Sequence, residues 1–288
     1  MTQRCSICQG ALEGRLLTIN DPDRFERHIG IPSAGYRRVW VVCSRCGSAT
    51  NRFESFSQSR LAELETAYYD VDLVGADIGE RFTKIMALPV GASDNALRVS
   101  RIAAYAASWF SNEAYSVLDI GAGTGVFLAR LIQQDNARLS RAVGVEPDPT
   151  AAAHLRELGL FEVISEPFPP ARALGNFQLI TLNKVLEHIA DPLSFIERIT
   201  ATLDPQCGLL YVEVPDVLTA THRPANDNIL GSLHRHLYSP RGLAEVLQRA
   251  GLDVLCVERV TEPSGKLSVY AYSSTSEAIS RWAGTREN

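Results

Sequence analysis

The 288-residue sequence lacks any apolar run that approaches the roughly 18 residues needed to cross a bilayer. Its opening residues, MTQRCSICQG, do not include the hydrophobic core of a secretory signal peptide. It also has no internal repeat and no low-complexity stretch. The sequence also lacks an excess of positive charge, with a net charge of -5 and a pI near 5.7. These values argue against general binding to nucleic acid or anionic membranes. We therefore expect a globular protein of the reducing cytoplasm.

Four of the six cysteines form two closely spaced pairs, Cys5 with Cys8 and Cys43 with Cys46. In a reducing compartment, such pairs usually hold Zn²⁺ through four thiolates in a tetrahedral site. A redox pair of the thioredoxin type is the alternative, but neither pair lies in a strand–helix–strand context. The sequence therefore predicts a zinc ribbon with a structural Zn²⁺. Residues 36–42 are expected to form the strand that enters the second pair.

From residue 116 onward, strand-like and helix-like segments alternate, which is typical of an α/β domain with a mainly parallel sheet. The predicted strands are residues 116–120, 142–146, 161–165, 177–182, 209–214, 252–259 and 267–273. The predicted helices are residues 125–134, 149–159, 192–203 and 239–250. Because a short turn joins the last two strands, they are expected to close the sheet as an antiparallel hairpin.

The sharpest chemical signal is the glycine-rich turn after the first of these strands, VLDIGAGTG at residues 117–125. Glycines let the backbone pass close to a bound nucleoside, and the helix that follows offers free N–H groups. A dinucleotide fingerprint, G-x-G-x-x-G, would need glycine at position 126, where this chain has Val126. Glu146 ends the second strand, where an acid can accept both hydroxyls of a ribose.

Three motifs in order resemble those of class I S-adenosylmethionine-dependent methyltransferases, over roughly residues 100–275. They are DIGAGTG from Asp119, GVEP around Glu146, and LNKVLEH around Asn183. The resemblance implies S-adenosylmethionine as cofactor. It implies that the methionine portion lies near Asp119, that Glu146 binds the ribose and that Asn183 lines the inner face of the cofactor. It implies an adenine contact at Glu166, although Pro167 departs from the family's usual Asp. The cofactor-binding residues expected are Asp119, Gly121, Ala122, Gly123, Gly125, Glu146, Pro147, Glu166 and Asn183.

The expected fold is α/β and Rossmann-like, with a seven-stranded, mostly parallel sheet, a C-terminal antiparallel hairpin and a small N-terminal zinc ribbon. We assign residues 1–56 to the ribbon, 57–112 to a helical connector, 113–276 to the methyltransferase domain and 277–288 to a tail. In the connector, Leu61, Leu64 and Tyr68 recur at helical spacing, an irregular loop spans residues 75–91, and a second helix is expected from 95 to 110.

The candidate catalytic residues lie mainly in the loop LHRHLYS, residues 233–239, beyond the fifth predicted strand. A hydroxyl or carbon nucleophile that attacks a sulfonium methyl group generally loses a proton to a base, and histidine suits this role near neutral pH. His236, His234 and His188 are the candidate bases, with His236 favoured, and Tyr238 is a candidate substrate contact.

This loop resembles that of bacterial sugar methyltransferases, in particular zinc-ribbon-bearing C-methyltransferases of nucleotide-linked deoxysugars, where His236 matches the proposed base. Leu233 stands where those enzymes carry a tyrosine, and their third domain is not in this sequence. Residues 81–89, RFTKIMALP, resemble methyltransferases of surface-polysaccharide pathways. The resemblance implies a sugar, nucleotide-sugar or polysaccharide precursor as acceptor, and it leaves the acceptor atom open.

Other functions remain open in the sequence. Residues 1–60 hold nine Arg, no Lys and five acids. These arginines can bind a diphosphate of the acceptor or follow RNA phosphates, as in zinc-bearing rRNA methyltransferases; the acidic remainder favours the first. A non-enzymatic interaction protein is a further possibility, against which the intact glycine loop argues. Metal-assisted methylation through Glu187, His188 and a later His is another, but Lys184 replaces the first carboxylate of the related RNA 3′-end methyltransferase motif.

Overall fold

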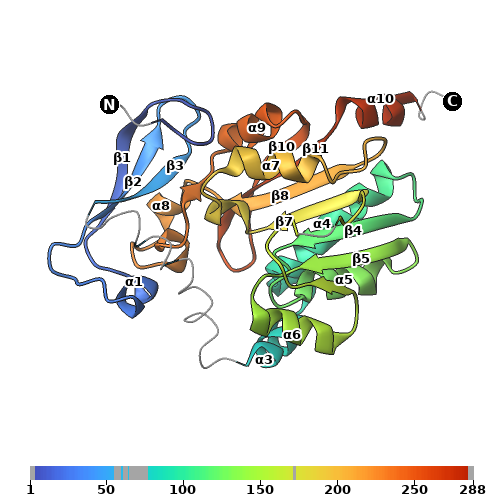
Figure 1. Cartoon of the computed structure of the whole chain (residues 1–288), viewed down its shortest axis with the longest axis horizontal. Coiled ribbons are helices and arrows are strands. Elements are labelled where there is room, and N and C mark those ends of the chain that lie inside the picture. Colours follow the sequence, from blue (N-terminus) through green and yellow to red (C-terminus); the bar gives the residue numbers. More distant parts are fainter. Residues whose placement is uncertain (1–3, 55–59, 61–63, 65–76, 171–172, 285–288) are drawn as a thin grey trace.

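The computed structural model describes residues 4–54, 60, 64, 77–170 and 173–284. In this described part the chain forms two sheets, one of four strands near the N-terminus and one of seven strands in the remainder (Figure 1). No helix among the described residues is long and apolar enough to cross a membrane.

The large sheet has the strand order β10-β11-β8-β7-β4-β5-β6, and its five strands from β8 to β6 run parallel. Its strands are β4 (Tyr115–Ile120), β5 (Leu139–Val145), β6 (Glu162–Ile164), β7 (Leu179–Asn183), β8 (Leu209–Pro215), β10 (Asp253–Thr261) and β11 (Leu267–Ser274). The hairpin β10–β11 pairs antiparallel, and β11 also pairs antiparallel with β8. The predicted fold class and all seven predicted strands are confirmed, with shifts of a few residues at the strand ends.

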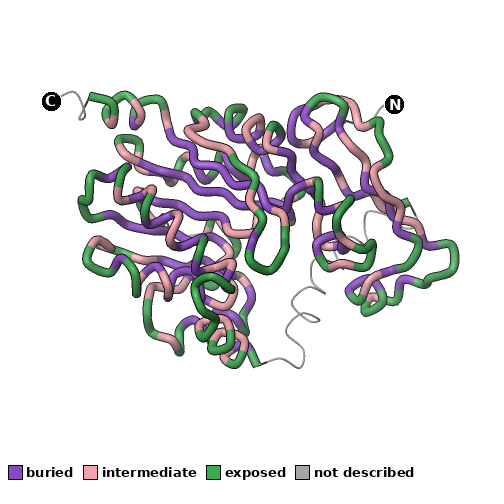
Figure 2. Tube along the Cα trace, turned by 180° about the vertical axis from the view of Figure 1, so that it is seen from behind, coloured by how far each residue is buried: buried purple, intermediate pink, exposed green. Residues whose placement is uncertain are grey.

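Helices cover both faces of the large sheet, whose strands β4, β7, β8 and β11 are buried along most of their length (Figure 2). One face packs against α7 (Pro192–Thr200) and α9 (Pro240–Arg249), and the other against α4 (Asp94–Trp109) and α5 (Val126–Asp135). The other helices and helical turns are α1 (Arg24–His28), α3 (Ile78–Met86), α6 (Pro149–Leu158), α8 (Thr219–His222), α10 (Ser276–Gly284), η1 (Val90–Ala92), η2 (Leu186–His188) and η3 (Asn228–Leu230).

The small sheet has the order β1-β2-β3-β9 and joins two distant parts of the chain. It contains β1 (Leu12–Ile19), β2 (Arg38–Cys43), β3 (Ala49–Phe53) and β9 (His236–Leu237). β9 pairs with β3 through Thr50 and His236. The N-terminal segment is therefore bound directly to the loop that precedes α9, and the small sheet takes one strand from the segment assigned by sequence to the methyltransferase domain.

One local prediction is wrong: α3 occupies most of the segment predicted to be an irregular loop. The side chain of Asp77 accepts a hydrogen bond from the backbone N–H of Gly79 and caps the helix. Gly79 lies in the first turn, and Arg130 from α5 donates to the carbonyl of Ile85 near the other end. The glycines misled the prediction because tertiary packing outweighed weak helix propensity. The first predicted connector helix lies almost wholly outside the described residues.

Candidate functional site

The turn between β4 and α5 requires glycine at its key positions. Gly121, Gly123 and Gly125 have φ angles of 77°, 54° and 79°, in the left-handed region that side chains disfavour. A Cβ atom on Gly121 would also lie 2.6 Å from Cγ2 of Val185. Ala122 between them is buried. The loop thus lies close against the segment after β7, and its backbone N–H groups stand at the start of α5.

Asp119, the last-but-one residue of β4, is buried and hydrogen-bonded to the neighbouring strand. Its Oδ1 accepts from the Thr181 hydroxyl at 2.6 Å and from the Asn183 side-chain amide at 2.8 Å. Burial raises the pKa of Asp119 to about 7, an effect that Arg98 opposes and Glu146 reinforces. The side-chain Oδ1 of Asn183 is itself buried and has no hydrogen-bond partner among the described residues. A polar group so placed is suited to a ligand.

Glu146 connects the glycine loop to the start of α6. Its Oε2 accepts from the backbone N–H of Gly123 at 2.8 Å, and its Oε1 accepts from that of Asp148 at 2.9 Å. Burial raises the pKa of Glu146 above its usual value. Pro147 beside it is half-buried, whereas Glu166, just after β6, is exposed. The expected cofactor residues therefore gather at the carboxyl ends of the parallel strands, where open α/β sheets bind ligands.

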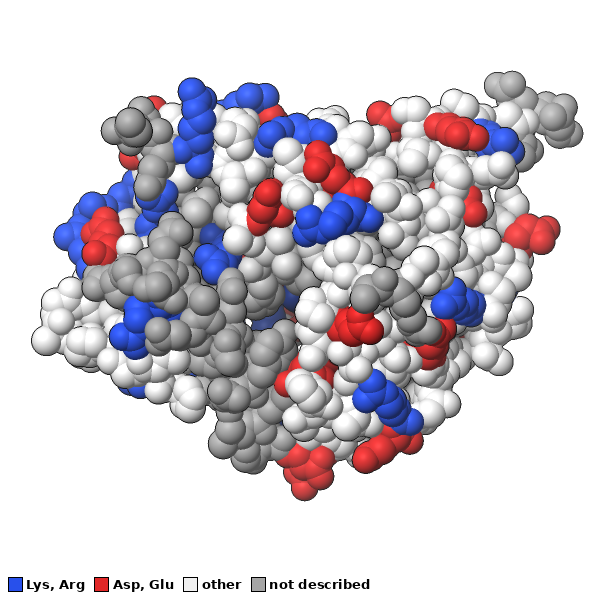
Figure 3. Space-filling model, in the orientation of Figure 1, with Lys and Arg blue, Asp and Glu red and all other residues white. Residues whose placement is uncertain are grey.

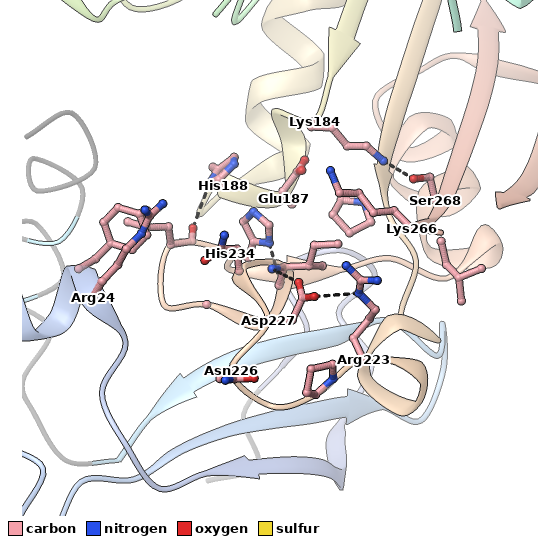
Figure 4. A pocket seen from close by; sticks show the side chains of 18 residues that line it. Arg24, Lys184, Glu187, His188, Arg223, Asn226, Asp227, His234, Lys266 and Ser268 are labelled. Atoms are coloured by element: carbon pink, nitrogen blue, oxygen red, sulfur yellow. Dashed lines mark hydrogen bonds and ion pairs between the residues drawn. The ribbon is translucent and has the colours of Figure 1, made fainter. Parts of the chain in front are cut away.

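A pocket of about 610 Å³ adjoins this edge of the sheet (Figure 4). It lies between the two sheets, with Arg24 of α1 on one side and the turn after β7 and the β10–β11 hairpin on the other. Its lining is rich in charge and contains Arg24, Lys184, Glu187, His188, Arg223, Asp227, His234 and Lys266. Asn183, which contacts Asp119, directly precedes Lys184, so the glycine loop and the pocket share one strand end.

His188 and His234 meet in the wall of this pocket, with ring centroids 4.6 Å apart. His188 Nδ1 lies 3.2 Å from the carbonyl oxygen of Leu233, and His234 Nδ1 lies 2.6 Å from that of Ile229. Burial lowers the pKa of His188 to about 4 and that of His234 to about 3. Both imidazoles are therefore neutral at pH 7. Burial raises the pKa of the neighbouring Glu187 carboxyl to about 8.

The structure does not bring the other two candidate catalytic residues into the pocket. His236 is 2% exposed, with Nε2 lying 3.3 Å from the Ser6 hydroxyl and Nδ1 lying 3.4 Å from that of Thr50. Burial lowers the pKa of His236 to about 4. Tyr238 is fully buried, and its hydroxyl donates to the carbonyl of Leu186 at 3.3 Å. Both side chains lie in the packing between the small sheet and the large one.

Sequence reasoning counted Arg24 among the arginines that can bind a diphosphate, but it missed the other cations of the pocket. The chain has only three lysines, and two of them, Lys184 and Lys266, line the cavity. Lys184 Nζ lies 3.2 Å from Glu213 and 3.0 Å from Glu262, and Glu213 is also paired with Arg98 of α4. The rarity of lysine was the one available signal, because the partners come from segments far apart in the sequence.

The four predicted metal ligands converge at one end of the small sheet. Sγ of Cys5 and Cys46 lie 3.9 Å apart, those of Cys8 and Cys43 lie 3.3 Å apart, and all four are buried. Four thiolates around Zn²⁺ at about 2.3 Å would lie about 3.8 Å from one another, so the cluster fits that ion. Gly10 is needed beside it, because a Cβ there would lie 2.8 Å from Cys43 Sγ.

The cysteine cluster is also packed into the main core. Its four cysteines belong to the same buried cluster as the residues of α7, α9 and the large sheet. Ser239, the N-cap of α9, donates from its hydroxyl to the carbonyl of Cys46, and Arg45 forms an ion pair with Glu245. Arg249 donates to the carbonyl of Ile7. The cluster thus holds α9 and the strand before it in place.

The topology, with a β10–β11 hairpin closing a parallel sheet beside a glycine loop after β4, is that of Rossmann-like methyltransferases. Residues 92–257 match the family model described as a methyltransferase domain. This stretch exceeds half of the 288 residues, and the chain belongs to this methyltransferase family.

Curated relatives match a shorter part of the chain. The ubiquinone biosynthesis O-methyltransferase of Escherichia coli O157:H7 is 28% identical over 114 residues, which are 38% of this chain and 46% of the relative. The protein of the same name from Histophilus somni is 32% identical over 102 residues, 33% of this chain and 42% of the relative. The chain therefore spans less than half the length of these relatives.

Solved structures match over a larger part. The 1,6-didemethyltoxoflavin-N1-methyltransferase of Burkholderia thailandensis, with bound 1,6-didemethyltoxoflavin and S-adenosylhomocysteine, has a TM-score of 0.53 at 17% identity and covers 81% of this chain and 96% of its own. Magnesium protoporphyrin IX methyltransferase from Synechocystis PCC 6803, with bound S-adenosylmethionine, has a TM-score of 0.53 at 12% identity. This match covers 74% of the present chain and 97% of the Synechocystis chain. At these identities the likeness establishes the fold.

Proposed function

We propose that this protein transfers a methyl group from S-adenosylmethionine to an anionic sugar-containing acceptor. One observation carries the proposal: the glycine loop with Asp119 and Glu146 shares the end of β7 with a cation-lined pocket of about 610 Å³. The two matched structures described above hold S-adenosylhomocysteine or S-adenosylmethionine, which supports the choice of cofactor.

The hydrogen bonds at the strand ends support the cofactor roles that we propose. Glu146 is placed to accept the ribose hydroxyls, because each carboxylate oxygen has a further lone pair beyond the backbone N–H it already accepts. Asp119 is placed to pair with the ammonium group of the methionine portion, and the unpartnered Oδ1 of Asn183 to accept from it. Gly121 and its neighbouring glycines leave room for the chain between these groups. Exposed Glu166 remains the proposed adenine contact.

Cofactor affinity is expected to rise with pH through the titration of Asp119. The pKa of this carboxyl is about 7 in the free protein, and only its ionised form attracts the cofactor ammonium. Affinity for S-adenosylhomocysteine should therefore increase about 25-fold from pH 5.5 to pH 7.5, in proportion to the ionised fraction of this carboxyl. Calorimetric titrations at several pH values measure this. The Asp119→Asn variant should bind more weakly and show a flat profile; the same slope in that variant would refute the assignment.

The pocket supports an acceptor that carries phosphate or carboxylate groups. Four cationic side chains line it, against the carboxyl groups of Glu187 and Asp227. Asp227 forms an ion pair with Arg223 at 2.8 Å. Lys and Arg also predominate over the N-terminal part of the face in Figure 3. Nucleotide-linked sugars combine hydroxyl groups with such charge, in line with the resemblance to sugar methyltransferases.

The acceptor class is tested by S-adenosylhomocysteine release with a panel of nucleotide-sugars, the matching free sugars and structured RNA. We expect turnover with nucleotide-sugars, and a KM at least about fivefold higher for the Lys266→Ala variant because a charged hydrogen bond is lost. Turnover of RNA alone, with a steep dependence on salt, would replace this acceptor with the RNA alternative. Cofactor binding without any turnover would favour the non-enzymatic interaction protein.

The residues that contact the acceptor are a separate part of the proposal. Sequence reasoning favours His236 as the general base, but its ring contacts Ser6 and Thr50 rather than the pocket. We instead place the acceptor at the pocket wall that His188 and His234 form. In the same assay, His236→Gln should keep most of the turnover, and its loss with an intact fold would return the role of base to His236. Tyr238 is proposed as a support for the turn at Leu186.

We further propose that Cys5, Cys8, Cys43 and Cys46 hold a structural Zn²⁺. Burial raises the pKa of the Cys8 thiol to about 11, so the ion would have to displace a proton there. All four ligand positions would be filled by thiolates, which leaves no open position for chemistry.

A further inference from the structure

Glu187, His188 and His234 form a compact group on one wall of the pocket. One candidate ligand atom from each lies within 4.8 Å of the other two. Glu187 and His188 are neighbours in the η2 turn after β7, whereas His234 comes from the loop before β9. Figure 4 shows the three side chains side by side at the pocket. Their approach is therefore a product of the fold and not only of sequence adjacency.

The two imidazoles are held in the same tautomer. Nδ1 of His188 faces the carbonyl of Leu233, and Nδ1 of His234 faces the carbonyl of Ile229. A carbonyl oxygen only accepts, so in each ring Nδ1 carries the proton and the lone pair lies on Nε2. Histidines that bind metal ions usually donate their second ring N–H to a carbonyl or carboxylate in this manner. The backbone thus prepares both rings as ligands.

The burial of Glu187 is an independent observation that points to a bound cation. Its side chain is only 1% exposed, and its Oε2 has no hydrogen-bond partner within the described part of the chain. Leaving a buried polar oxygen without a hydrogen-bond partner is costly. In the sequence, Lys184 argued against a metal site, because it replaces a carboxylate of the related motif. In the structure, Lys184 is paired at 3.2 Å with Glu213 and at 3.0 Å with Glu262. Its direct ion pairs are therefore with carboxylates other than Glu187.

We propose that Glu187, His188 and His234 bind one divalent transition-metal ion, with its remaining coordination positions open to the pocket. Two imidazoles and one carboxylate form a common ligand set of catalytic zinc sites. Imidazole suits Zn²⁺ better than Mg²⁺, and the carboxylate makes Mn²⁺ an acceptable ion for the same set. Side-chain shifts of about 1 Å would bring the three ligand atoms to the ~2.0–2.2 Å bond lengths of such sites.

The ion would hold an oxygen of the acceptor beside the cofactor, and this step alone rests on the proposed function. A hydroxyl bound to a divalent ion loses its proton more readily, here to a water molecule. The oxygen then forms a bond to the methyl carbon, and the carbon–sulfur bond breaks with its electron pair remaining on sulfur. The products are the methylated acceptor, S-adenosylhomocysteine and a proton.

The test uses the full chain loaded with one equivalent of Zn²⁺. This protein is titrated with Mn²⁺, and the concentration of free Mn²⁺ is measured by electron paramagnetic resonance. Mn²⁺ suits this purpose because thiolates bind it poorly, which keeps it out of the cysteine cluster. We expect one Mn²⁺ per chain. Glu187→Gln and His234→Ala should each weaken binding at least about tenfold. The exposed histidine variant His222→Ala is the matched control and should bind as the wild type does.

Two results would overturn the site: no Mn²⁺ bound by the folded wild-type protein, or unchanged affinity in both variants. Thermal unfolding of each variant separates a lost ligand from a lost fold, and His234→Gln is the milder second variant. The titration contains neither cofactor nor acceptor. Its failure would therefore leave the proposed methyl transfer standing, whereas failure to bind S-adenosylhomocysteine would leave the metal site standing.

Discussion

Replacing Cys46 by Ser is expected to destabilise the whole protein and not only its N-terminal ribbon. Structural zinc sites contribute on the order of 10 kcal/mol to folding, which is comparable to the whole stability of a typical domain. Cys46 is 2% exposed and lies in the same buried cluster as α7 and α9. Its carbonyl also accepts from the N-cap residue Ser239. We expect a fall in Tm of at least about 10 °C.

Hydrogen exchange locates this effect. In the Cys46→Ser variant, amide exchange should accelerate in α9 as well as in β2 and β3, because α9 begins at Ser239 against the cluster. Cys207→Ser is the matched control, since Cys207 is half-buried and outside the cluster, and its Tm should change by only a few degrees. Faster exchange confined to residues before 54 would show that the ribbon folds independently, against this account.

Replacing Glu146 by Ala is expected to abolish measurable cofactor binding. The variant loses the acceptor for the ribose hydroxyls and leaves the N–H groups of Gly123 and Asp148 without their partner. Hydrogen bonds to a charged group contribute about 1.5–3 kcal/mol each, so affinity for S-adenosylhomocysteine should fall by at least about 100-fold. Isothermal titration of the zinc-loaded variant measures the loss.

Two further variants give this result its meaning. Glu146→Gln keeps one acceptor oxygen and should bind with intermediate affinity. Glu157→Ala removes an exposed acid from the neighbouring helix α6 and should bind as the wild type does. Wild-type affinity in the Glu146→Ala variant would mean that this carboxylate only braces the loop and that the ribose lies elsewhere.

The fold was largely predictable because each of its elements carries a local signal. The seven strands of the large sheet are short apolar runs between turn residues. Gly121 and Gly125 mark the turn after β4, because both have a positive φ angle that other residues rarely adopt. The two cysteine pairs specify their site by spacing alone. The exception was α3, whose capping residue Asp77 was outweighed by nearby glycines in the sequence pattern.

The pocket was not predictable because its residues are brought together only by tertiary contacts. The sequence singled out His236, but the pairing of β9 with β3 directs it into packing beside Thr50. A short strand of two residues has too weak a pattern to be recognised in advance. Arg24 of α1 and Lys266 of the hairpin meet across the pocket although most of the chain separates them. Local sequence patterns do not predict contacts between such distant segments.

The most direct test of this account is isothermal titration of the wild-type, zinc-loaded protein with S-adenosylhomocysteine. The arrangement of Asp119, Glu146 and Asn183 at the carboxyl ends of β4, β5 and β7 predicts one molecule bound per chain with micromolar affinity. S-adenosylmethionine should compete for the same site. A folded protein that binds neither compound would contradict the proposed methyl transfer and leave the chain a methyltransferase fold with another role.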